Sequence, residues 1–92
     1  MIANLLEKDV LRFTPAGIAV FEGKFRHEGQ VYEAGAMRRL EFDFPAVAFD
    51  DAAVRLDQVN PAQQLEIVGF LAPKSMKTQK LVVHITEFTI RS

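Results

Sequence analysis

The sequence predicts an all-β fold, a five-stranded barrel in a single domain that spans residues 1–92. Short apolar stretches with a period of two recur along the chain, and turn-forming residues separate them. A short helix at residues 52–56, or an irregular segment in its place, is expected between the third and fourth strands. Five strands with a helix in that place follow the order of the OB-fold, a Greek-key barrel. An apolar share of 49% in 92 residues fits one small globular domain.

The first two strands are expected on either side of a turn at Thr14-Pro15-Ala16-Gly17. Proline presets one backbone angle of such a turn, and glycine accepts a positive φ. Residues 4–13 carry both helical and strand spacing of apolar residues, so this stretch alone leaves its conformation open. Residues 19–27 alternate clearly, and Phe25 belongs to their core-facing side. Two strands around one turn is the interpretation we favour.

The middle of the chain predicts a third strand and the helix. A second turn is expected at Glu28-Gly29-Gln30, and an irregular stretch at Glu33-Ala34-Gly35. The alternation that follows directs three residues to the core: Leu40, Phe42 and Phe44. Pro45 is expected to end the regular pairing, because proline has no N–H to donate. Asp50-Asp51 offers an N-cap for the helix, whose apolar side, with Phe49 before it, would close one end of the barrel.

The last two strands are expected at residues 65–71 and 81–90, both rich in apolar residues. In the last strand, Leu81, Val83 and Ile85 alternate on one face, whereas Phe88 and Ile90 fall on the opposite face. This switch predicts a bulge near residues 86–87, unless both faces of the strand are partly buried.

Positive charge gathers on this last hairpin, although the whole chain has a formal net charge of −1. Residues 1–66 carry seven Lys or Arg against eleven Asp or Glu, a net of −4, whereas residues 67–92 carry four against one, a net of +3. The loop holds three lysines, Lys74, Lys77 and Lys80. A polyanion responds to local potential, and a flexible ammonium can contact phosphates without reading bases. We therefore expect this loop to bind a nucleic-acid backbone; the plain alternative is solvated surface.

Further candidates for nucleic-acid contacts lie before and within the third strand. Arg38 and Arg39 precede its core residues, and the alternative for them is a solvated surface pair. Tyr32 lies in a polar stretch, so its ring is a candidate for stacking on a base. For Phe13, the sequence leaves two alternatives, a place in the core or a stacking contact with a base.

The sequence contains no recognisable catalytic or metal site, and neither an enzyme nor a cofactor is expected. It has no cysteine, which excludes disulfides and thiolate chemistry. His27 and His84 are too few for a metal site, and both are expected in the core or at its rim. No apolar run reaches the roughly 20 residues of a membrane span. Charged residues near the start interrupt any signal-peptide core, so a soluble, cytoplasmic protein with no membrane contact is expected.

Several segments resemble the primosomal replication protein N family, small bacterial relatives of single-stranded DNA-binding protein. The matching segments are Asn4-Leu5, Thr14-Pro15-Ala16-Gly17-Ile18, Glu33-Ala34-Gly35, Phe44-Pro45, Gly69-Phe70-Leu71 and Lys80-Leu81-Val82-Val83-His84. Their order and spacing cover essentially the whole chain. The resemblance implies an OB-fold homodimer that binds single-stranded DNA and assists replication restart. It also implies two protein partners, the restart helicase and the protein that helps to load the replicative helicase.

The resemblance carries over to particular residues. Lys74 and Lys80 match basic positions of the family, Lys77 matches less closely, and Arg12 lies where relatives tend to be basic. Glu41 stands where relatives can carry a stacking aromatic, and the chain has no tryptophan. Binding is therefore expected to depend on phosphate contacts more than on stacking.

Two other functions remain open from the sequence. One is a general single-stranded DNA-binding protein, and the other is an OB-fold module that holds a protein partner through the same loop. The general class usually ends in a disordered acidic tail, whereas this sequence ends directly after its last expected strand, which favours the accessory protein. A small core and an open edge on the first strand favour a homodimer.

Overall fold

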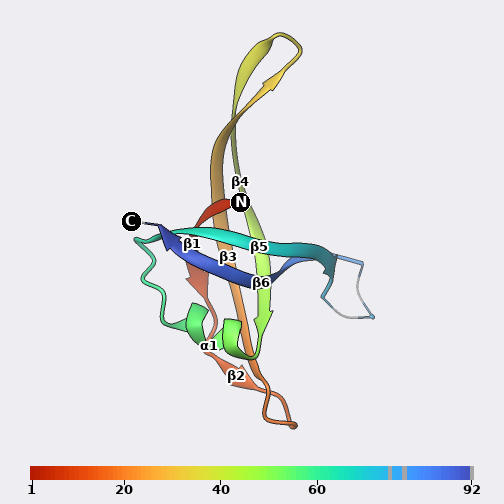
Figure 1. Ribbon diagram of the computed structural model, residues 1–92. Coiled ribbons are helices and arrows are strands. Elements are labelled where there is room, and N and C mark those ends of the chain that lie inside the picture. Colours follow the sequence, from red (N-terminus) through yellow and green to blue (C-terminus); the bar gives the residue numbers. More distant parts are fainter. Residues whose placement is uncertain (75, 78, 92) are drawn as a thin grey trace.

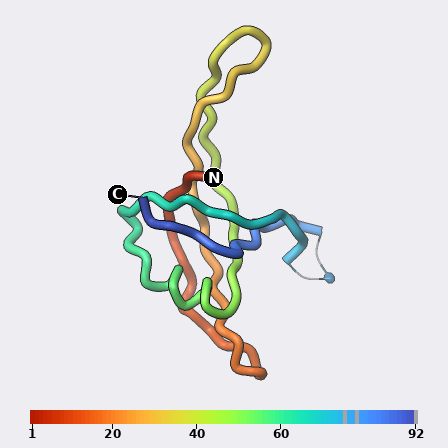
Figure 2. Tube along the Cα trace, viewed as in Figure 1, coloured from red at the N-terminus to blue at the C-terminus, as the bar shows by residue number. Residues whose placement is uncertain are grey.

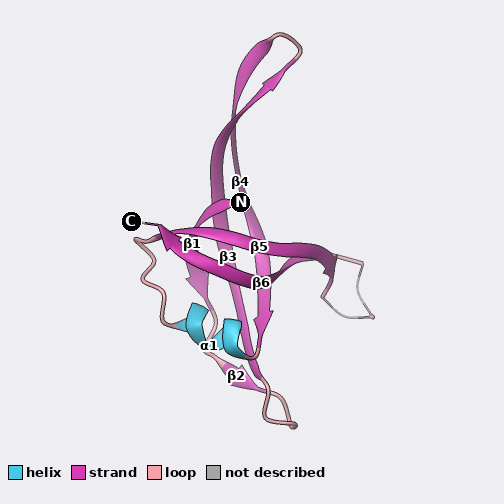
Figure 3. Ribbon diagram, in the orientation of Figure 1, coloured by secondary structure: helices cyan, strands magenta, loops and turns pink. Residues whose placement is uncertain are grey.

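The computed structural model describes residues 1–74, 76–77 and 79–91. Its strands and helix are β1 (Ile2–Lys8), β2 (Arg12–Phe13), β3 (Ala19–Glu33), β4 (Ala36–Phe49), α1 (Asp51–Asp57), β5 (Gln64–Pro73) and β6 (Leu81–Arg91). The strands pair in the order β1-β5-β6-β4-β3-β2, and an additional pairing of β1 with β3 closes the barrel (Figure 1, Figure 3). The predicted OB-fold barrel is confirmed, with the two-residue β2 as a small addition to the five longer strands.

Large apolar side chains from the strands and from α1 fill the barrel. The largest fully buried ones are Phe21, Phe25, Leu56 and Leu65. Phe25 stacks on Phe44, with ring centroids 5.9 Å apart. Burying each such side chain contributes roughly 1.5–3 kcal/mol. Ala53 and Leu56 of α1 belong to this core, so the helix closes one end of the barrel, as predicted (Figure 1).

The first predicted turn is confirmed between β2 and β3. The Gly17 N–H donates to the Thr14 carbonyl at 2.8 Å, and the Ile18 N–H donates to the Thr14 hydroxyl at 3.1 Å. Gly17 has a φ of 85°, which glycine adopts without steric cost. Phe13, on β2, is exposed.

β3 and β4 form a long hairpin that extends well beyond the barrel (Figure 1, Figure 2). Their pairing continues from Val20 with Phe49 to Glu33 with Ala36. The predicted turn at Glu28-Gly29-Gln30 is therefore wrong, because pairing with β4 holds this stretch extended despite its glycine. The irregular stretch predicted at residues 33–35 contains the real turn, where Ala34 and Gly35 have positive φ.

Pro45 lies inside β4, so the prediction that it ends the pairing is wrong. It is the partner of Lys24 in β3, and β4 continues to Phe49. On its other side, β4 pairs with β6 at Ala46 and Val47. A proline is tolerated where its position in the ladder requires no N–H donor.

The predicted alternation of β4 has the correct phase, but the burial differs. Phe44 is buried, whereas Leu40 and Phe42 on the same face are 37% and 41% exposed. Both lie where the hairpin leaves the barrel, and no other described element covers that face (Figure 1). The length of the hairpin, which alternation alone does not set, decides this exposure.

α1 begins without the predicted side-chain cap. Asp50 holds the N-cap position with φ 62° and ψ −133°, and its side chain makes no capping hydrogen bond to a described residue. Asp51, in the first turn, places a negative charge at the positive end of the helix dipole. Phe49 is exposed rather than buried under α1, and its ring lies 6.3 Å from that of His84.

β5 and β6 pair along both strands with one bulge. Thr86 is the extra residue of β6, between the partners of Val68 and Gly69. The bulge predicted near residues 86–87 is confirmed, and the Thr86 hydroxyl donates to the Val68 carbonyl at 3.1 Å. Because of this bulge, Ile85 and Phe88 both reach the core. Leu81 and Ile90, by contrast, are exposed rather than buried.

β1 is not the open edge strand that was predicted. Residues 4–5 and 7–8 pair with β3, and residues 2–4 pair with β5. Barrel closure therefore uses much of the hydrogen-bonding capacity that an edge strand would present to another chain.

Candidate nucleic-acid interface

One face of the barrel wall, here called the outward face, collects side chains from four strands. Val20 pairs with Phe49, Val47 with His84, and Phe70 with His84. Partners in a ladder point to the same side of a sheet. The cluster of Val20, Val47 and Val82 forms a small buried patch of this face.

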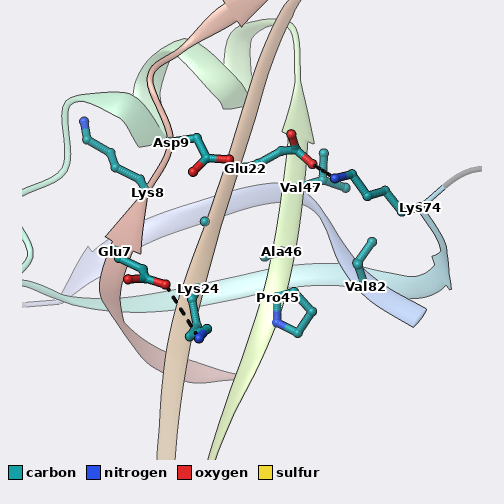
Figure 4. Close-up of a pocket in the computed structure, with 11 residues that line it drawn as sticks. Glu7, Lys8, Asp9, Glu22, Lys24, Pro45, Ala46, Val47, Lys74 and Val82 are labelled. Carbon is teal, nitrogen blue, oxygen red and sulfur yellow. Dashed lines mark ion pairs between the residues drawn. The ribbon is translucent and has the colours of Figure 1, made fainter. Parts of the chain in front are cut away.

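Glu22 of β3 lies at the centre of the predicted basic site. Its Oε2 is 3.0 Å from Arg12 Nη2, and its Oε1 is 2.5 Å from Lys74 Nζ. The Glu22 side chain is only 18% exposed, whereas both cations are about half exposed. The structure therefore brings Arg12 and Lys74 together around a carboxylate (Lys74 and Glu22 in Figure 4). Sequence reasoning missed Glu22, because it is far from Lys74 in the chain and only strand pairing reveals their contact.

A cavity of about 230 Å³ opens on the outward face beside Glu22 (Figure 4). Its lining mixes both signs of charge, since Lys24 is 3.6 Å from Glu7 and Lys74 pairs with Glu22. Lys8, at the rim, pairs with Asp57 of α1 at 2.9 Å. The cavity itself is therefore close to neutral, and the excess positive charge lies in the adjoining loop.

That loop joins β5 to β6 and carries the three predicted lysines. Lys77 and Lys80 are exposed, as is Lys74. The Lys74 N–H donates to the Lys80 carbonyl at 3.4 Å, which holds the two ends of the loop together. The three lysines thus belong to the connection at one end of the β5–β6 hairpin, and β5 and β6 reach this end at one side of the barrel (Figure 1).

The other predicted site residues lie on the β3–β4 hairpin, away from the lysine loop (Figure 2). Tyr32 is 71% exposed. Arg38 Nε is 3.7 Å from Glu33, and Arg39 Nη2 is 3.4 Å from Glu41. Strand register places Tyr32 and Arg39 on one face of the hairpin and Arg38 on the other, so the three residues are not brought together on one surface.

Arg26 and Asp43 face each other across β3 and β4. Arg26 Nε donates to Asp43 Oδ1 at 2.8 Å, and Nη2 donates to Oδ2 at 3.3 Å. This hydrogen bonding lowers the pKa of the Asp43 carboxyl and raises the pKa of the Arg26 guanidinium. Glu41 is a second anion near Arg26, at 3.8 Å. Arg26 is therefore engaged within the hairpin.

Three rings on adjacent strands form a row across the outward face, here called the aromatic row: Phe49, His84 and Phe70. The rings of Phe70 and His84 are nearly parallel, with centroids 5.0 Å apart and an 8° angle. Phe49 is tilted by 31° against His84. Sequence reasoning did not single out Phe49 or Phe70 for stacking, because the row forms only when three strands align.

His27 lies at the rim of the core with a hydrogen-bond partner, as predicted, whereas His84 lies on the outward face. His27 Nδ1 lies 2.6 Å from the Ile2 carbonyl. His84 is partly buried, and its Nε2 is buried without a hydrogen-bond partner among the described residues. In residues 1–74, 76–77 and 79–91 no metal-binding cluster of His, Asp or Glu is found. No helix of that part of the chain is long and apolar enough to cross a membrane.

The chain is similar to known proteins over most of its length. Residues 1–87 match a family described as another single-strand binding protein family. Replication restart protein PriB of Nitrosomonas europaea is 37% identical over 79 residues, which cover 86% of this chain and 73% of that protein. Replication restart protein PriB of Bordetella pertussis is 36% identical over 85 residues, or 92% of this chain and 79% of that protein.

Solved structures agree with these relatives. The protein PriB from Ralstonia solanacearum superimposes with a TM-score of 0.88 at 36% identity, covering 100% of this chain and 94% of that one. The single-stranded DNA-binding protein from Thermus aquaticus has the same fold, with a TM-score of 0.71 at 17% identity over 99% of this chain and 48% of that one. The chain therefore belongs to the PriB family of replication restart proteins, within the wider group of single-strand binding proteins.

Proposed function

We propose that the protein binds single-stranded DNA as an accessory of the replication-restart primosome. The observation that carries this proposal is the group of three lysines at the end of the β5–β6 hairpin, beside the outward face of an OB barrel. Barrels of this kind bind oligonucleotides on a sheet face and on the loops next to it. We propose a cytoplasmic binding protein that needs no cofactor and catalyses no reaction.

The lysine loop suits the DNA backbone better than the bases. Ammonium groups contact phosphates without reading sequence, so we expect little sequence preference. Arg12 adds a guanidinium next to Lys74 through their shared carboxylate, Glu22. A flexible single strand can follow a curved barrel, whereas a duplex stays straight over about 150 base pairs.

We assign Tyr32, Arg38 and Arg39 to a second contact that only a longer strand reaches. Tyr32 is the only tyrosine, and the chain has no tryptophan, so tyrosine emission reports on this residue alone. Quenching by a long oligo-dT, but not by one that covers the lysine loop alone, would support this assignment. Unchanged emission with both lengths would contradict it.

Protein partners are proposed for the β3–β4 hairpin. Its uncovered face exposes Val31, Leu40 and Phe42. A two-stranded ribbon is marginally stable by itself, so contact with another chain would stabilise it. We infer that this face serves a homodimer or the restart helicase and helicase-loading protein, the partners expected for this family.

A second candidate function, an OB module that holds a protein partner without DNA, is favoured by one observation. Glu22 already neutralises part of the charge of Arg12 and Lys74. The two functions differ in their salt dependence, because phosphate binding releases condensed counterions.

The test is fluorescence anisotropy of labelled oligo-dT and of duplex of equal length, at two salt concentrations. We expect the single strand to bind more tightly, and its affinity to fall steeply with added salt. Equal affinity for both DNA forms would mean that binding is non-specific electrostatic attraction. Absence of binding would favour the second candidate function, an OB module that binds a protein partner.

A further inference from the structure

Phe70 ends the aromatic row on the side away from β4. One face of its ring is covered by His84, with an interplanar angle of 8°. The side chain is nevertheless 55% exposed. β1, the next strand beyond β5 in the sheet, pairs with β5 only at residues 2–4 of β1 and 64–66 of β5. Among the described strands, none continues the sheet beyond Phe70 on that side, so the ring presents its other face to an open edge.

A second observation concerns the edge of β5. A cavity of about 480 Å³ follows this edge and is lined by residues 67–71 together with Met1 and Val83. Val83 pairs with Leu71 and with Ala46, on the side of the sheet opposite to the rings of Phe70 and His84. The edge of β5 is therefore uncovered next to Phe70, and the free face of the ring borders this open edge.

The charge near Phe70 indicates which ring would enter. Lys74 follows Phe70 by four residues on β5 and its loop, roughly 13 Å further at the rise of a strand. Lys74 points to the outward face, where it contacts Glu22. An exposed aromatic ring next to a lysine-rich loop complements a polymer that alternates aromatic bases with phosphates.

We propose that Phe70 stacks on a nucleobase of bound single-stranded DNA through the ring face that His84 leaves uncovered. This inference rests on the proposed function and adds the base contact that the phosphate-binding loop lacks. A phenyl ring offers no hydrogen bonds to base edges, so the contact tolerates any base.

The first experiment compares Phe70→Leu with Leu81→Ala, a matched control at an equally exposed apolar position of the same hairpin. Removing one base stack should weaken oligo-dT binding about 5- to 100-fold. The slope of log K against log salt should stay constant, because no phosphate contact is lost. Phe70→Trp should retain affinity, and Leu81→Ala should bind as the wild type does. Melting curves establish that each variant is folded.

The second experiment keeps the wild-type protein and removes the bases from the ligand. An abasic oligonucleotide has the same phosphates, so the wild type should bind it more weakly than oligo-dT. Phe70→Leu should bind the abasic strand as the wild type does. In Phe70→Trp, the single tryptophan should be quenched by oligo-dT and not by the abasic strand.

Different results separate this inference from the proposed function. If the wild type binds oligo-dT and Phe70→Leu binds it equally well, Phe70 is not a stacking position, but the DNA-binding function stands. A wild type that does not bind oligo-dT overturns both. A Phe70→Leu variant with altered mass in light scattering and unaltered DNA affinity would assign the ring to a contact between copies of the chain, which also overturns the stacking position.

Discussion

Glu22 limits how much positive charge the protein offers to a polyanion. Its nearly buried carboxylate contacts Arg12 and Lys74, at 3.0 and 2.5 Å. Each of these ion pairs holds a cation that could otherwise contact a phosphate. One residue of β3 therefore reduces the positive charge that the loop between β5 and β6, much later in the sequence, offers to DNA.

We predict that Glu22→Gln strengthens oligo-dT binding about fivefold, since one charge–charge contact in a wet environment is worth roughly 1 kcal/mol. The salt slope should steepen by about 0.7 for each further phosphate that Arg12 or Lys74 then neutralises. Anisotropy titrations at several salt concentrations measure both. Glu87→Gln is the control, because it removes the same charge from the bulged part of β6. An affinity that Glu22→Gln leaves unchanged would show that Arg12 and Lys74 do not contact DNA.

At Gly69, next to the bulge, the backbone of β6 leaves no room for a side chain on β5. A Cβ atom there would overlap the His84 carbonyl oxygen, which is a backbone atom and cannot move aside as a side chain would. We predict that Gly69→Ala lowers the free energy of unfolding by about 3 kcal/mol, at the upper end for single substitutions. Gly29→Ala, where the nearest atom belongs to the His27 side chain at 3.1 Å, should cost much less. Urea denaturation of both variants tests this, and equal losses would contradict it.

At the scale of elements, the β5–β6 hairpin and the β3–β4 hairpin project from different sides of one barrel (Figure 1). The first carries a net positive loop, and the second carries arginines that are paired with Glu33 and Glu41. We therefore expect the lysine loop to dominate the electrostatics of DNA binding.

Changing Lys74, Lys77 and Lys80 together to Ala tests the loop. Each phosphate neutralised on a single strand contributes about −0.7 to the salt slope, so the slope should flatten by roughly 2 units per occupied loop. Affinity should fall alike for all sequences. The fold should persist, because exposed loop substitutions change stability by only about 0.5 kcal/mol. Wild-type affinity and slope in a folded triple variant would refute the loop as the contact, and Asp50→Asn with Asp51→Asn is the control.

At the scale of the whole molecule, a small core is combined with uncovered apolar surface. Both the outer part of the β3–β4 hairpin and the edge of β5 expose large apolar side chains. A 92-residue domain without disulfides gains stability by burying such surface against another chain.

We therefore predict a homodimer in solution. Light scattering at tens of micromolar protein should return about twice the monomer mass of 10.3 kDa. Phe42→Lys, on the uncovered hairpin face, should shift the mass toward the monomer if that face forms the contact. A monomer mass for the wild type would contradict the prediction.

Much of the architecture follows from local pattern. The turn at Thr14–Gly17, the helix before β5 and the bulge at Thr86 depend on backbone preferences and alternation within a few residues, and all three are present. The same local rules fail at Gly29 and Pro45, where pairing with a neighbouring strand overrides the preference of one residue.

The sequence by itself determined the strands, their succession along the chain with the helix before the last two, and the concentration of lysines in one loop, because these depend on residue types that are close together in the chain. Only the tertiary structure decided which charges and rings meet. Glu22 reaches Lys74, and Phe70 stacks on His84, through strand register. Register depends on how all strands close together around one core, and no local stretch of sequence contains that information.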